Sequence, residues 1–257
     1  MAGRVITVAQ QKGGSGKTTV AVNLAVALRG RGHSVALLDT DPQGSMGRWF
    51  LERLERRGED EALEFGTSSA WGASYESDKL KKRFDYVIID TPPKIDSDLR
   101  PALRVADLVV VPVATSQVDL WATEGVLDLA RREKCDTLIV LNRTRANTRL
   151  TGDVALGAAE LGAEVADAQL ANRVAYAETL GQGLGAGESS RNAAARAENE
   201  QRDLVSLMVR LRCDSAWERM IVPAFVFYFA KLYPFASIAN PRSRVAAETL
   251  TNTGLVV

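Results

Sequence analysis

The sequence predicts an α/β fold in which a doubly wound, mostly parallel sheet carries helices on both faces. Three observations lead to this prediction: apolar runs short enough for buried strands, segments with helical spacing between them, and polar residues directly after several strands. Strands that alternate with helices pair in parallel, because each helix must cross over the sheet. Such a sheet binds ligands at the carboxyl ends of its strands.

The expected elements follow in chain order. Five apolar runs are the expected strands, at residues 5–9, 34–38, 86–89, 108–113 and 137–141. The expected helices between them include residues 18–29, 98–106 and 119–131. Four polar residues stand just after these strands, and we expect them at one edge of the sheet: Asp39, Asp41, Asp90 and Asn142.

The composition is that of an ordinary protein with one substantial core. The chain has 257 residues, 46% hydrophobic and 25% charged, and 32 basic residues balance 32 acidic ones. Any binding to nucleic acid or to a membrane surface therefore needs a local patch. Cys135 and Cys213 have neither zinc-site nor secretory spacing, and no signal peptide is evident, so we expect a cytoplasmic location.

The C-terminal part is expected to differ from the core. We expect a mobile loop or linker at residues 181–187 and an alanine- and charge-rich helix at 192–212, which closes a first domain of residues 1–212. Residues 213–257 form an apolar tail. Its segment 220–239 has the length of a membrane span, but Lys231 and two prolines disfavour that interpretation, so packing on the core or a partner is preferred to membrane contact.

Residues 12–19 form a glycine-rich loop between the first strand and helix. They fit the pattern Gly-x-x-x-x-Gly-Lys-Thr if the first glycine is relaxed, since Gln11 stands there. Glycines let successive N–H groups face one concavity at a helix start, which cradles phosphate better than a plain flexible turn would. We expect Lys17 to reach the β- and γ-phosphates of ATP and Thr18 to complete the coordination of Mg²⁺. The expected nucleotide-binding residues are Gly13, Gly14, Ser15, Gly16, Lys17, Thr18 and Thr19.

Lys12 is a second lysine that one subunit does not need for holding phosphate. With it, the run Lys-Gly-Gly-Ser-Gly-Lys-Thr at residues 12–18 resembles the signature of the ParA/MinD family of deviant Walker ATPases. The resemblance implies a P-loop NTPase fold and an ATP-dependent homodimer, in which Lys12 reaches the partner's nucleotide. A solvated loop lysine is the alternative. Lys12 and Lys17 are accordingly expected catalytic residues.

Acidic residues complete the expected site. Asp39 and Asp41 belong to an Asp-x-Asp-Pro-Gln-Gly segment like the family's first switch, which implies that Asp41 orients the attacking water and Asp39 supports the magnesium shell. The alternative is an aspartate turn that caps the next helix. Asp90 ends an apolar strand in the Walker B manner and is the expected magnesium ligand, with Thr18.

Three further segments resemble the family. Residues 91–93 are similar to its second switch. Asn142 stands where family members place an asparagine against adenine, although a strand-end turn residue is an equal alternative. Trp121 is expected to pack its helix rather than to bind a ligand.

The resemblance implies a slow, partner-stimulated ATPase that partitions plasmid or chromosome DNA. Its ATP dimer would bind nonspecific DNA on the nucleoid, and a ParB-like adaptor would stimulate hydrolysis. Nonspecific binding needs basic groups against phosphate; the candidates are Arg143, Arg145, Arg149 and Arg173, unless they form a merely solvated face. A MinD-like positioning ATPase for a protein or membrane cargo is the alternative, and a metabolic kinase is third, because no acceptor-binding lid is evident.

Overall fold

The computed structural model describes residues 3–93, 99–146 and 148–189. They form one parallel sheet in the order β3-β2-β4-β1-β5-β6-β7, with β8 also paired to β6. The strands are β1 Arg4–Val8, β2 Val35–Asp39, β3 Leu63–Thr67, β4 Tyr86–Asp90, β5 Leu108–Ala114, β6 Thr137–Thr144, β7 Glu164–Val165 and β8 Leu170–Ala171. This confirms the predicted fold class.

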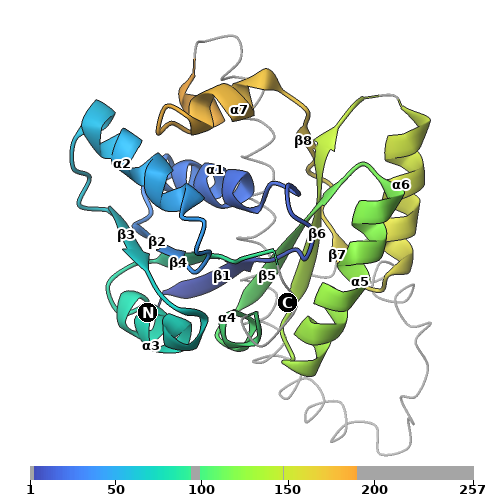
Figure 1. Ribbon diagram of the computed structural model, residues 1–257, viewed down its shortest axis with the longest axis horizontal. Helices are drawn as coiled ribbons and strands as arrows, with labels where there is room; N and C mark the ends of the chain where they lie inside the picture. Colours follow the sequence, from blue (N-terminus) through green and yellow to red (C-terminus); the bar gives the residue numbers. More distant parts are fainter. Residues whose placement is uncertain (1–2, 94–98, 147, 190–257) are drawn as a thin grey trace, which may run out of the picture. The chain divides into compact units, whose positions relative to one another are not determined.

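Helices cover both faces of the sheet (Figure 1). They are α1 Lys17–Arg29, α2 Ser45–Arg57, α3 Ala73–Leu80, α4 Arg100–Arg104, α5 Gln117–Arg132, α6 Arg149–Glu160 and α7 Val174–Leu180, with 3-10 turns η1 Ala70–Gly72 and η2 Ala186–Glu188. Helices α1, α2 and α7 lie on one side, and α3 to α6 lie on the other. Helical crossovers between successive strands let all the strands run in the same direction.

The core consists of aliphatic strand residues packed under these helices. β4 is buried over its full length, as a central strand covered on both faces must be. Below the sheet, Val109 and Ile139 pack with Leu127 of α5 and Val154 of α6. The register of the central strands sets Asp90 beside Val8 and also beside Asp39. The core thus fixes two carboxylates side by side at the carboxyl edge.

All five predicted strands are present, but three strands were not predicted. The edge strand β3 has the sequence Leu-Glu-Phe-Gly-Thr, in which only Leu63 is buried. An edge strand that is half exposed lacks the continuous apolar run of a central strand. Strands β7 and β8 have two residues each, and a segment this short shows no detectable periodicity.

The expectation of a mobile loop or linker at residues 181–187 is wrong. Leu184 and Ala186 are buried there, and the Ala186 N–H donates to Asn23 Oδ1 at 2.8 Å. The glycines allow close packing. Gly183 has φ 65°, and a Cβ at this position would lie 2.2 Å from the backbone nitrogen of Arg53. This segment is part of the folded core.

Several expectations fall on residues outside the described ranges. They are the helix at 192–212, the domain boundary after 212, the tail 213–257 with its segment 220–239, and the first residue of the helix expected at 98–106. Within the ranges that the structure describes, no helix combines the length and the apolar character that crossing a bilayer requires.

Candidate functional site

The phosphate loop connects β1 to α1. Gly14 has φ 76° and Gly16 has φ 94°, both in the left-handed region that favours glycine. Gly16 is also the N-cap of α1 and offers no side-chain cap, so the first N–H groups of the helix remain available to an anion. A Cβ on Gly16 would meet the amide nitrogen of Asn142 at 2.4 Å. The predicted glycine loop therefore has the geometry of a phosphate cradle.

Lys17 is the buried cation of this cradle. Its exposed fraction is 7%, and burial lowers the pKa of its ammonium group against the attraction of Asp90 and Asp41. A buried ammonium is costly unless a negative group compensates for the lost water. The environment of Lys17 therefore fits a bound phosphate.

Thr18 and Asp90 are in direct contact, as expected for a pair that shares a metal ion. The Thr18 hydroxyl donates to Asp90 Oδ2 at 2.6 Å. Burial raises the pKa of Asp90 to about 7, and the neighbouring Asp39 adds to the rise, while the Thr18 hydrogen bond and Lys17 oppose it. Asp90 Oδ1 and Asp39 Oδ2 are buried without a hydrogen-bond partner. Orphaned carboxylate oxygens of this kind fit Mg²⁺, which prefers oxygen ligands.

Mg²⁺ would draw few ligands from the protein. The described part of the chain holds no group of three or more His, Cys, Asp and Glu side chains arranged for a metal ion. Magnesium commonly takes one or two carboxylates and completes its shell with water and nucleotide phosphates. The Thr18–Asp90 pair with Asp39 nearby agrees with that mode of binding.

Asp39 and Asp41 lie at the turn between β2 and α2. Burial raises the pKa of Asp39, although the nearby backbone of Asp41, Gly47 and Met46 opposes the rise. Asp39 Oδ1 accepts from the Asp41 N–H at 2.9 Å. Asp41 is half-buried, and its Oδ1 accepts from the Gln43 N–H at 3.0 Å. Both aspartates therefore stabilise the turn before α2, but neither caps this helix, whose N-cap Gly44 has no side-chain cap hydrogen bond. Their place in the turn is compatible with a role beside the nucleotide.

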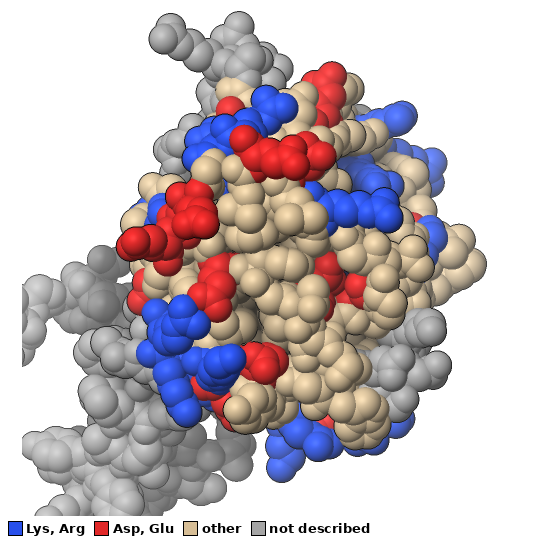
Figure 2. Space-filling view, turned by 60° about the vertical axis from the view of Figure 1, so that its left-hand side comes forward, with Lys and Arg blue, Asp and Glu red and all other residues tan. Residues whose placement is uncertain are grey.

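Asp41 borders a groove of about 920 Å³ between α2, β3, η1 and the loop after β4. Leu51, Phe65, Trp71 and Pro93 supply much of its apolar lining. Figure 2 shows the side of the molecule that carries α2 and β3, with acidic and basic side chains interspersed around uncharged areas. No field of a single sign covers this face, so it does not suit nonspecific DNA.

Lys12 forms an ion pair with a residue of α5. Its Nζ lies 2.6 Å from Asp119 Oδ2 at the start of α5, and the Lys12 side chain is 39% exposed while that of Asp119 is 5% exposed. Ser116 caps α5 and also donates to the Asp119 carboxylate. Sequence reasoning gave Asp119 no role, although the Ser-x-x-Asp pattern at 116–119 signals a helix start.

Gln10 is a second residue that sequence reasoning missed. It is completely buried, and its Nε2 donates to Thr123 Oγ1 of α5 at 3.0 Å and to the Pro112 carbonyl at 3.3 Å. Its Oε1 accepts from the Gln11 N–H. Because the partners are more than 100 positions away, no local pattern reveals them. Gln10 anchors the base of the phosphate loop to α5.

Asn142 lies beneath the phosphate loop. Its amide donates to the Ser15 carbonyl at 2.8 Å, and its Oδ1 accepts from the Arg143 N–H. These contacts show that Asn142 supports the loop, while its contact with adenine stays a prediction. Thr91 donates to the Val8 carbonyl, so the segment after β4 begins firmly attached to β1.

Trp121 does not pack its helix as predicted. Its exposed fraction is 62%, and the neighbouring Val118 is 54% exposed. Both lie in the first turns of α5, the helix that holds Lys12 through Asp119. The error arises because an aromatic residue at helical spacing gives no sign of which face is covered.

The four candidate arginines come from neighbouring elements. Register places Thr144 of β6 beside Ala171 of β8, so the chain after each strand lies at the same sheet edge. Arg143 and Arg145 are exposed near the end of β6, Arg149 begins α6, and Arg173 precedes α7. Arg149 also pairs loosely with Asp153 at 3.6 Å. The structure therefore brings the predicted basic residues to one region.

Comparison with known proteins agrees with this geometry. The family model described as the CobQ/CobB/MinD/ParA nucleotide binding domain matches residues 6–183. "Maintenance of carboxysome distribution protein A" of Halothiobacillus neapolitanus is 28% identical over 185 residues, which cover 70% of this chain and 84% of that protein. "Chromosome-partitioning ATPase Soj" of Thermus thermophilus is 36% identical over 151 residues, 49% of this chain and 59% of its own length.

A solved structure gives the same fold. The septum site-determining protein MinD of Pyrococcus horikoshii, complexed with Mg-ADP, superposes with a TM-score of 0.66 at 18% identity and covers 80% of this chain and 97% of that one. At this identity the likeness concerns the fold. The chain spans less than two thirds of the length of the Thermus relative.

Proposed function

The chain belongs to the CobQ/CobB/MinD/ParA nucleotide-binding family, which includes P-loop ATPases, and on this premise we propose that it is an ATP-hydrolysing dimerisation switch for DNA partitioning. Its ATP-bound dimer binds DNA without sequence preference. A ParB-like adaptor stimulates hydrolysis, and release of the dimer from DNA follows. Hydrolysis acts as a timer, so slow basal turnover suits the role.

The position of Lys12 is the observation that carries this proposal. Lys12 is not buried in the loop as Lys17 is: it pairs with Asp119 of α5, and 39% of its side chain is exposed. That placement supports a reach into a second subunit. The exposed Val118 and Trp121 lie beside it on α5, and an apolar patch around a reactive residue supports burial in an interface.

The other residues have separate tasks in the proposed reaction. The N–H groups of the phosphate loop and Lys17 hold the phosphates of ATP, and Thr18 with Asp90 holds Mg²⁺, which supplies charge neutralisation when bound. Asp41 orients the attacking water. Phosphoryl transfer needs positioning and electrostatics more than a strong base, so a half-buried carboxylate suffices.

A second candidate function is the positioning of a protein cargo, in the manner of MinD-like proteins. The similarity to a carboxysome distribution protein over 84% of that relative's length favours it. Both candidates share the ATP-dependent dimer. They differ in the adaptor and in what the adaptor carries.

Sedimentation in the presence of ATP and Mg²⁺, with and without nonspecific DNA, tests the proposal. We expect a dimer with ATP, a monomer with ADP, and retention on DNA only in the ATP form. An ATP-dependent dimer that does not bind DNA would favour the second candidate. Absence of any ATP-dependent dimer would refute both.

A further inference from the structure

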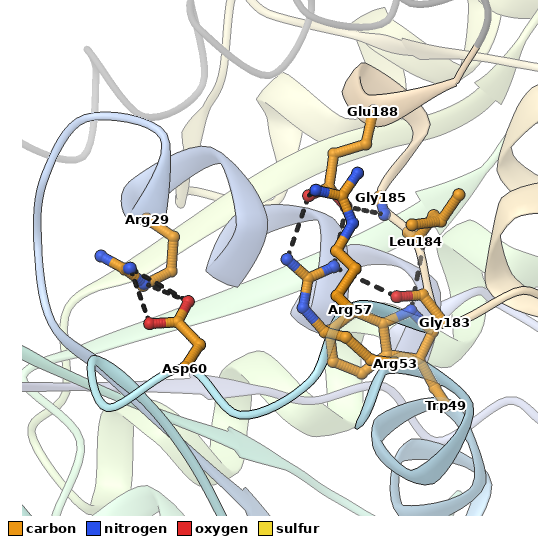
Figure 3. Close-up of polar contacts among 9 residues, drawn as sticks. All are labelled: Arg29, Trp49, Arg53, Arg57, Asp60, Gly183, Leu184, Gly185 and Glu188. Atoms are coloured by element: carbon orange, nitrogen blue, oxygen red, sulfur yellow. Dashed lines mark hydrogen bonds and ion pairs between the residues drawn. The ribbon is translucent and has the colours of Figure 1, made fainter. Parts of the chain in front are cut away.

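The loop at residues 183–188 is bound tightly to α2 (Figure 3). Trp49 Nε1 donates to the Leu184 carbonyl at 3.1 Å. Arg53 lies one helical turn further along α2. Arg53 Nη1 donates to the Gly183 carbonyl at 3.1 Å, and its two terminal nitrogens reach the Glu188 carboxylate at 2.8 and 3.0 Å. We call Trp49, Arg53 and Glu188 the α2 clamp.

The other side of this loop is bound to α1. The Ala186 N–H donates to Asn23 Oδ1 at 2.8 Å. A Cβ on Gly185 would lie 2.8 Å from Val26 Cγ1 of α1. A Cβ on Gly183 would lie 2.2 Å from the backbone nitrogen of Arg53 in α2. The loop therefore fills the space between the two helices and fixes their separation.

The ion pair between Arg53 and Glu188 is largely buried and bidentate. The side chains of Arg53 and Glu188 are 9% and 17% exposed. Burial alone would raise the pKa of Glu188, but the Arg53 hydrogen bond, the Gly185 N–H and the charges of Arg53 and Arg57 hold it below its ordinary value. A bidentate pair with little solvent resists displacement, because moving either partner leaves a buried charge.

Both helices begin at the nucleotide site. α1 starts with Lys17 of the phosphate loop, and α2 starts at Ser45, shortly after Asp41. The Asp41 turn is itself held to the end of β2, since the Asp41 N–H donates to Asp39 Oδ1 at 2.9 Å. Any shift of α2 relative to α1 must therefore move the Asp41 turn relative to Lys17.

We propose that Arg53 and Glu188 are positioning residues for ATP hydrolysis, which hold α2 against α1 and thereby set Asp41 at its working distance from the phosphate loop. The inference rests on the proposed role of Asp41 in hydrolysis. Neither residue touches the nucleotide. Their effect is expected on turnover, because a displacement of about 1 Å in a positioned group can cost on the order of 100-fold in rate.

A second ion pair supplies the matched control. Arg29 of α1 binds Asp60, beyond the end of α2, with Nη2 to Oδ1 at 2.8 Å and Nε to Oδ2 at 3.1 Å (Figure 3). It is also bidentate and also links α1 to the α2 side. It does not contact the 183–188 loop, so its loss should leave α2 in place.

The test compares Glu188→Gln with Asp60→Asn in the full chain. We expect Glu188→Gln to lower the kcat for ATP by at least about tenfold with KM within about twofold, and Asp60→Asn to stay within about twofold of the wild type. In an Asp41→Ala background, Glu188→Gln should lower kcat no further, because both changes remove the same step. Equal losses in both single variants, or losses that multiply with Asp41→Ala, would overturn the inference.

Hydrogen exchange of residues 39–47 is a readout that does not need turnover. We expect faster exchange in Glu188→Gln and in Trp49→Phe, which deletes one hydrogen bond and keeps an aromatic ring, but not in Asp60→Asn. Unchanged exchange in Trp49→Phe and in Glu188→Gln would overturn the inference even if both variants fold. A wild type without ATP turnover would refute the proposed function, while exchange would still decide the role of the clamp.

Discussion

At the scale of single residues, the two lysines of the phosphate loop have opposite surroundings. Lys17 is buried in the cradle, whereas the Lys12 side chain is 39% exposed and pairs with Asp119 of α5. The same residue type therefore has two different environments within one loop. This difference makes their roles separable by mutation.

Lys12→Ala should leave a folded protein that binds ATP but hydrolyses it poorly when stimulated. Removing one group that stabilises transition-state charge costs roughly 100-fold in turnover. Stimulated hydrolysis and ATP binding should be measured side by side, with Lys17→Ala as the control that loses ATP binding. Turnover at the wild-type rate in Lys12→Ala would refute the role in a second subunit.

Asp41→Ala should trap the ATP-bound dimer. Without the carboxylate that orients water, hydrolysis should fall by roughly 100-fold, while the phosphate loop and the Thr18–Asp90 pair remain intact. Size-exclusion chromatography with ATP should then show a dimer that persists for hours. Rapid phosphate release from the variant would remove Asp41 from the mechanism.

Asp90 makes the stability of the ligand-free protein depend on pH. Burial raises its pKa from 3.8 to about 7, so between these values the folded protein keeps a proton that the unfolded chain has released. Stability is therefore lost as the pH rises through this window. At ~1.4 kcal/mol per pKa unit, the loss over the whole window amounts to roughly 4 kcal/mol, of which roughly 3 kcal/mol falls above pH 5. Urea unfolding at pH 5 and pH 8 without Mg²⁺ should show it, and Asp90→Asn should lack that component.

At the scale of elements, sequence patterns predict what is local and miss what is distant. Lys17, Thr18 and Asp90 are predictable, because a glycine loop and a strand end are contiguous patterns and parallel strands bring their ends together. The contacts of Gln10 with Thr123 and of Arg53 with Glu188 join residues more than 100 positions apart. Such contacts depend on tertiary packing, which no periodicity encodes.

The glycines of the 183–188 loop show the same limit. Their density predicts flexibility, while the structure uses Gly183 for a close approach to α2. Composition gives the conformational freedom of a glycine but not the neighbour that requires it. Only the packed structure distinguishes a linker from a tight contact.

Gly183→Ala should therefore destabilise the protein more than an alanine at another left-handed glycine. Gly32 has φ 85°, and a Cβ added there would have nothing within 4 Å, so Gly32→Ala should cost only the conformational strain of about 1 kcal/mol. Gly183→Ala adds a clash with the α2 backbone, which should cost roughly 1–3 kcal/mol more. Urea unfolding of both variants gives the comparison, and equal costs would contradict the tight contact.

At the scale of the whole molecule, charge is balanced overall and must act through its distribution. The α2–β3 face has interspersed charges (Figure 2), whereas Arg143 and Arg145 stand exposed near the end of β6 and the start of α6. Nonspecific DNA binding should thus depend on the β6–α6 side.

Reversing Arg143 and Arg145 to glutamate should weaken DNA binding of the ATP form and flatten its dependence on salt. Each lost phosphate contact lowers the slope of log K against log salt by about 0.9, so two lost contacts in each subunit should lower it by roughly 3 to 4 in the dimer. Arg132→Glu is the control, since this exposed residue ends α5 just before β6 begins, at the amino ends of the strands. ATP-dependent dimerisation should stay unchanged in both variants. An unchanged slope in the double reversal would move the DNA surface elsewhere. The control changes the charge by half as much, so a loss half as large in the control would show that net charge alone sets the affinity.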